Sequence, residues 1–88
     1  MKKEFLYDHA LSKFGIEAQR YMLFEECGEL LDAISKFQRG RAEQEDVVTE
    51  LADVTIMCEQ MARYYGWGAY ELHLAKKRKR LYQRVFKE

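Results

Sequence analysis

Two acidic motifs are spaced so that four of their side chains can meet across a pair of helices: Glu25, Glu26 and Glu29, then Glu50 and Asp53. In an antiparallel helical hairpin, facing residues have a constant sum of residue numbers. The numbers of Glu29 and Glu50 add up to 79, and so do those of Glu26 and Asp53. Half of that sum falls directly before Gly40, where a glycine is expected to end the first helix. The spacing therefore predicts four carboxylates facing one another in pairs.

Four carboxylates at the edge of a core repel one another and resist desolvation, so a bound cation is expected among them. Oxygen ligands without histidine or thiol suit Mg²⁺ or Mn²⁺ better than Zn²⁺. A di-iron site requires Glu-x-x-His on two helices, and no glutamate here has a histidine three positions later. His9 and His73 lie outside both acidic segments and are expected at the surface. A single E-x-x-E indicates only surface acids, but two sets in register favour a Mg²⁺ or Mn²⁺ site.

A basic segment near the C-terminus predicts a phosphate-containing ligand. Lys77 lies between Leu74 and Leu81 on the apolar side of a helical pattern, and Arg80 and Arg84 follow on its flank. Metal ions bridge phosphate oxygens, and Lys or Arg neutralises the remaining charge. The same basic run could contact nucleic acid, but it lacks a reading helix or a stacking platform. We therefore expect a polyphosphate ligand and no nucleic-acid partner.

The elements that must position these residues are helices. The chain has no proline, and its glycines separate segments of helical period. We expect helices over 3–13, 16–39, 44–65 and 69–87. Apolar stripes, including those through Leu23 and Leu30, Leu51 and Val54, and Leu74 and Leu81, are expected to form the core. Cys27 and Cys58 lie within the stripes and are expected to be buried. The predicted fold class is all-α: an antiparallel hairpin core with flanking helices, four-helix-bundle-like and assembled as an oligomer.

Length and composition set the limits. Eighty-eight residues predict one domain, 1–88, with a thin core that self-association could deepen. Hydrophobic residues are 48% and charged residues 34%, which excludes a disordered chain. No apolar run is long enough for a membrane span, and we expect no signal peptide. Two cysteines make no disulfide framework, so a cytoplasmic location is expected. Net charge is zero, with an acidic middle and a basic C-terminal part.

These motifs resemble a known superfamily. E-E-x-x-E followed by E-x-x-D on two antiparallel helices is similar to the pattern of the all-α nucleoside triphosphate pyrophosphohydrolases, which include the MazG-like proteins. The stretch GIEAQRYMLFEECGELLDAI…VTELADVTIMCEQM, with Gln19, is similar to small MazG-like proteins. The tail K-x-x-R-L-x-x-R also resembles theirs. The likeness covers roughly residues 14–85.

The resemblance implies Mg²⁺-dependent hydrolysis of a nucleoside triphosphate between its α- and β-phosphates, giving a monophosphate and pyrophosphate. It implies the following roles: metal ligands Glu26, Glu29, Glu50 and Asp53; a water-orienting Glu25; and phosphate-binding Lys77, Arg80 and Arg84. It also implies a homodimer or homotetramer. Two alternatives stay open at this point: a nucleotide- or metal-binding regulatory module with little turnover, and a helical dimerisation module. The intact acidic motif argues against the second.

Overall fold

The computed structural model describes residues 1–87, and within them the chain forms four α-helices and no strand. These are α1 (Lys3–Phe14), α2 (Ile16–Gln38), α3 (Gln44–Tyr65) and α4 (Trp67–Phe86). The predicted all-α class is confirmed, and every predicted helix is present with ends that agree to within two residues. The largest difference is at α4, which begins at Trp67 directly after Gly66.

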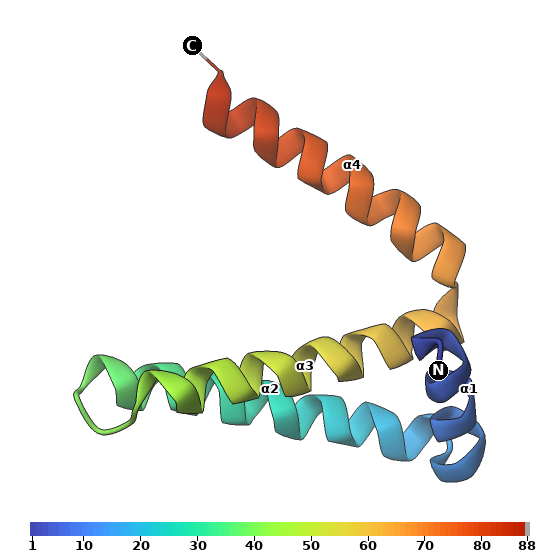
Figure 1. Ribbon diagram of the computed structural model, residues 1–88, viewed down its shortest axis with the longest axis horizontal. Helices are drawn as coiled ribbons and strands as arrows, with labels where there is room; N and C mark the ends of the chain where they lie inside the picture. The colour runs from blue at the N-terminus through green and yellow to red at the C-terminus, as the bar shows by residue number, and fades with distance from the viewer. Residues whose placement is uncertain (88) are drawn as a thin grey trace.

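The hairpin of α2 and α3 has a tight turn that the sequence specifies locally. Gly40 adopts a φ of 72°, a left-handed conformation that favours glycine. The backbone N–H of Arg41 then donates to the carbonyl of Lys36 at 2.8 Å, which closes the end of α2 in a Schellman-type arrangement. Glu43 and Asp46 form a capping box that starts α3. The two helices therefore run antiparallel and side by side, as Figure 1 shows.

Helix α1 packs across the open end of the hairpin, far from the turn (Figure 1). Three polar contacts hold it against α3, and one of them is the ion pair of Lys3 with Glu59 at 3.1 Å. The Tyr7 hydroxyl donates to Glu59 at 2.7 Å, and Arg63 donates two hydrogen bonds to Asp8 at 2.9 and 2.7 Å. The buried apolar residues gather mainly at this end: Tyr7, Met57, Met61 and Ala62, with Ala33 further along the hairpin. The best-packed part of the molecule is thus the junction of α1 with the hairpin.

Helix α4 leaves the end of α3 and diverges from the hairpin (Figure 1). None of the residues described for α4 is buried, and Leu81 is 57% exposed. The apolar face expected to be core on this helix is therefore uncovered in a single chain, which does not by itself complete a four-helix bundle. In the part of the chain that the structure describes, we find no helix long and apolar enough to cross a lipid bilayer.

The buried seam between α2 and α3 differs from the expected apolar stripes. Gln19, Ala33, Met57 and Gln60 are buried, whereas Leu51 of the expected stripe is about half exposed. The expectation that both cysteines are buried was wrong: Cys27 is half-buried and Cys58 is exposed. The reason is that periodicity identifies an apolar face but not the element that covers it. Here the helices contact each other along a line that runs beside the stripes.

Candidate metal centre

Three carboxylates from the two hairpin helices converge near the middle of the hairpin. Glu26 and Glu29 come from α2 and Glu50 from α3. One carboxylate oxygen from each lies within 4.8 Å of the others. The structure thus brings Glu29 and Glu50 together across the hairpin, as their spacing around the turn predicted.

Two of these side chains carry an oxygen that the chain itself does not satisfy. Oε2 of Glu26 and Oε2 of Glu50 are buried, and neither has a hydrogen-bond partner within residues 1–87. A buried carboxylate oxygen without a partner is costly, because it has lost its water and gained nothing in return. A divalent cation with oxygen ligands offers the missing interaction. The donor set therefore fits a Mg²⁺-type ion.

The electrostatics of the site point the same way. Burial raises the pKa of Glu26 above its ordinary value, and the charges of Glu29, Asp53 and Glu50 raise it further. Burial also raises the pKa of Glu50, followed by the charges of Glu29 and Asp53. Asp53 lies outside the group of three but near enough to act on both glutamates. The four predicted carboxylates therefore act on one another electrostatically, and three of them lie close enough together to bind the same ion.

The remaining predicted site residues are placed differently. Glu25 is exposed on α2, next to the half-buried Glu26. Lys77, Arg80 and Arg84 are exposed on α4. Because α4 diverges from the hairpin (Figure 1), the single chain does not bring these three cations to the carboxylates. Their phosphate-binding role stays a prediction.

Two cations close to the site were missed by sequence reasoning. A cleft of about 340 Å³ adjoins the carboxylates and continues toward the turn. We call it the acidic cleft; it is lined by Glu29, Asp32, Ala33, Lys36, Arg41, Ala42, Asp46, Thr49 and Glu50. Lys36 pairs with Asp32 at 2.8 Å, and the turn hydrogen bond ties Arg41 to Lys36. The sequence did contain a signal for Lys36, because it follows Glu29 by seven residues, which is two helical turns.

The structure is that of an all-α protein with a candidate divalent-cation centre. Its helical hairpin brings together carboxylates from both helices, and two of them hold buried oxygens without partners in the described residues. The family model of the MazG nucleotide pyrophosphohydrolase domain matches residues 14–80, which hold α2, α3 and most of α4. The chain therefore belongs to the MazG family, and this membership indicates a nucleotide pyrophosphohydrolase. No curated protein and no solved structure is significantly similar to it.

Proposed function

We propose that the chain is a Mg²⁺-dependent nucleoside triphosphate pyrophosphohydrolase of one domain. It cleaves the bond between the α- and β-phosphates and releases a nucleoside monophosphate and pyrophosphate. One observation carries the proposal: in a MazG-family chain, three carboxylates approach within 4.8 Å, and two of them hold buried oxygens without partners in the described residues.

In this proposal Glu26, Glu29, Glu50 and Asp53 hold Mg²⁺, for which Mn²⁺ can substitute. A bound ion of this kind neutralises phosphate charge and lowers the pKa of its water. Glu25 is exposed on α2 next to Glu26, and we assign to its carboxylate the role of accepting a hydrogen bond from the attacking water and orienting it. Because the pKa values of Glu26 and Glu50 are raised, both carboxyls bind a proton more tightly than usual, so metal binding and protonation compete.

The phosphate chain needs cations as well as metal. Lys36 and Arg41 supply two within the acidic cleft. Lys77, Arg80 and Arg84 supply more from α4, and because α4 leaves its own hairpin they serve the site of a second copy. The substrate phosphates then lie between the carboxylate-bound metal and two groups of basic side chains.

A homodimer or homotetramer is therefore part of the proposal. The chain exposes 7119 Å², whereas a folded monomer of this mass is expected to expose roughly 5,400 Å². The excess of about 1,700 Å² exceeds the ~800 Å² per partner of a standard interface. The basic α4 and the acidic hairpin complement each other in charge, so a second copy can complete the bundle. We place this activity in the cytoplasm, consistent with the two free cysteines.

The test is a release assay over canonical and modified nucleoside triphosphates with Mg²⁺ and with Mn²⁺. We expect equal amounts of monophosphate and pyrophosphate, and loss of both in Glu50→Gln. Glu45→Gln is the matched control, because Glu45 is an exposed acid on the same helix outside the acidic cleft. Release of inorganic phosphate alone would contradict the cleavage site. Metal-dependent nucleotide binding without turnover would instead support the regulatory-module alternative.

A further inference from the structure

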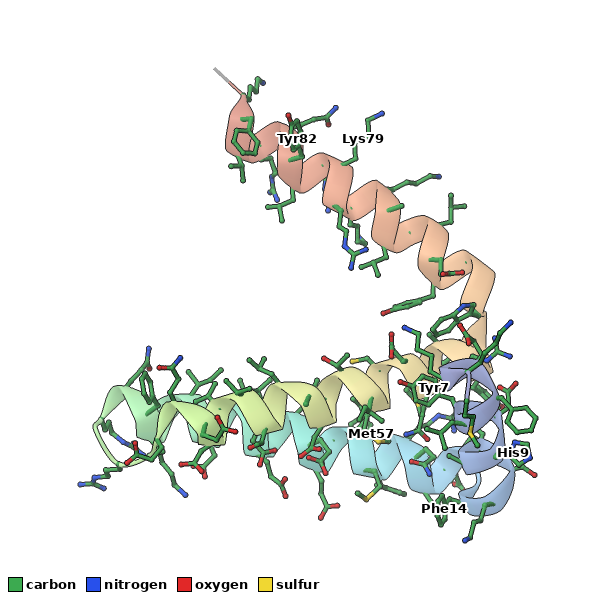
Figure 2. The ribbon with its side chains drawn as sticks, viewed as in Figure 1. Tyr7, His9, Phe14, Met57, Lys79 and Tyr82 are labelled. Carbon is green, nitrogen blue, oxygen red and sulfur yellow. The ribbon has the colours of Figure 1, made fainter. Side chains whose placement is uncertain are left out.

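A second cleft, of about 420 Å³, lies where α1 meets the open end of the hairpin. We call it the glutamine cleft; it is lined by Ala10, Phe14, Ala18, Gln19, Met22 and Gln60. Its walls are aromatic, aliphatic and thioether groups, interrupted by two amides. Figure 2 shows Phe14 on the side of the hairpin away from α4, so α4 does not cover Phe14. The cleft has the general composition of a small-molecule site: apolar walls with a few converging polar groups.

The amide of Gln60 is the unusual feature of this cleft. Gln60 is only 7% exposed, and Gln19 only 6%. Oε1 of Gln60 is buried and has no hydrogen-bond partner among the residues that the structure describes. Its Nε2 donates only to the sulfur of Met57, at 3.5 Å, and a thioether is a weak acceptor. Buried polar groups are nearly always hydrogen-bonded, so this amide calls for a partner from outside the chain.

The glutamine cleft and the acidic cleft open on the same face of the hairpin. An α-helix returns to nearly the same side every seven residues. Along α2, Met22 in one cleft is followed at this spacing by Glu29 and Lys36 in the other. Along α3, counting back from Gln60 by the same steps reaches Asp53 and then Asp46. Seven residues correspond to roughly 10 Å of helix. The carboxylates that line the acidic cleft therefore share one continuous face with the glutamine cleft.

We propose that the glutamine cleft binds the base of the substrate nucleotide. The inference rests on the proposed function, in which the metal and the phosphates occupy the acidic cleft. A nucleobase is flat and apolar on its two faces, which suits contact with Phe14 and Met22. Its edge carries both donors and acceptors, which an amide matches with Nε2 and Oε1. Gln60 accepts a hydrogen bond from a ring N–H or an exocyclic amine, and the phosphate chain points toward Lys36.

This arrangement fixes the direction of the substrate along the hairpin. The base lies at the end covered by α1, the sugar lies between the two clefts, and the α-phosphate reaches the carboxylates. The terminal phosphates then lie at the turn, where Lys36 and Arg41 line the acidic cleft. A nucleotide bound in the opposite direction would place its negative end against the apolar cleft and its base among charges.

The first experiment compares ligands with and without a base, using the full chain in Mg²⁺. The probes are the α,β-methylene analogues of the canonical ribo- and deoxyribonucleoside triphosphates, which resist cleavage, and inorganic tripolyphosphate. We expect at least one analogue to bind at least tenfold more tightly than tripolyphosphate. Gln60→Met should lose this advantage and leave tripolyphosphate binding unchanged. The control Gln38→Met changes an exposed glutamine of α2 and should keep it.

Equal affinity for every analogue and tripolyphosphate would overturn the proposal, and so would an undiminished advantage in Gln60→Met. Failure of tripolyphosphate and all analogues to bind would contradict the proposed function instead. The cleft is then tested by itself: the side-chain amide signals of Gln60 and Gln19 are followed in ¹H–¹⁵N spectra during titration with the five common nucleosides. A saturable shift of the Gln60 signal supports the base site. No shift with any of them at millimolar concentration overturns it.

Discussion

Adding Mg²⁺ or Mn²⁺ to the metal-free chain should raise its melting temperature substantially. Three carboxylates converge within 4.8 Å, and the cluster is assembled only when the hairpin is folded. A ligand that binds only the folded state stabilises it by about 2.7 kcal/mol when its concentration is a hundred times Kd. For a chain of this size, each kcal/mol moves the melting temperature by about 4–8 °C. The expected rise is thus about 10–20 °C at a fixed protein concentration.

The pH dependence of the melting temperature tests whether the carboxylates cause this stabilisation. The pKa values of Glu26 and Glu50 are raised above the ordinary 4.5, so the folded chain holds protons there more tightly than the unfolded chain. Their contribution to stability is complete below pH 4.5 and is lost as pH rises through the raised values. Asp8 acts in the opposite direction, because its hydrogen bond from Arg63 lowers its pKa below 3.8. Its contribution is lost only as pH falls through that lowered pKa.

The assay is a set of melting curves from pH 3 to pH 8, with and without metal. Without metal, the melting temperature should decline above about pH 4.5, relative to Glu50→Gln under the same conditions. With saturating metal the decline should be absent. Glu50→Gln should abolish the metal response, and the control Glu45→Gln should keep both features of the unchanged chain. The reasoning is refuted if metal leaves the melting temperature unchanged and Glu50→Gln has the same pH profile as the unchanged chain.

Three further predictions test other parts of the molecule. Lys77→Ala should lower kcat/KM more than tenfold, or about 1.4 kcal/mol, with calorimetric Mn²⁺ binding unchanged; equal small effects in Lys79→Ala would show a merely solvated helix. Sedimentation at micromolar concentration should give a multiple of 10.5 kDa, and a mass of 10.5 kDa would contradict self-association. Gln60→Met should raise the free energy of unfolding in urea by about 1 kcal/mol, because it removes a buried unsatisfied amide, while Gln38→Met should change it by less than ~0.5 kcal/mol.

The sequence predicted the meeting of Glu29 and Glu50 because two local signals are sufficient for it. Gly40 ends one helix, and the residue numbers around it then determine which positions face each other. The same information did not reveal which apolar residues are covered. Leu51 and Leu81 belong to regular stripes but remain about half exposed, because covering them depends on another element or another chain. Periodicity describes one helix, whereas burial depends on two.

Gln60 and Lys36 were missed for a related reason. A glutamine within a helical pattern is ordinarily solvated, and a lysine four residues after Asp32 is ordinarily half of a surface ion pair. Their importance comes from the position of the contact line between α2 and α3, which buries Gln60 and places Lys36 on the wall of the acidic cleft. Seven-residue steps from Glu29 and Asp53 lead to both, but only once the acidic residues are known to mark the contact line.

The buried polar groups without partners and part of the uncovered apolar surface lie on opposite sides of the hairpin. In the described residues, the buried oxygens without partners belong to Glu26, Glu50 and Gln60, which all adjoin the face of the two clefts. Leu31 and Leu51 are exposed and point roughly 150° away from that face on their respective helices. Buried polar groups without partners indicate a bound ligand, whereas exposed apolar groups indicate contact with another protein surface. The apolar side is therefore suited to packing against a second copy, and the other side to a metal-bound nucleotide, where a second copy contributes only the basic side chains of its α4.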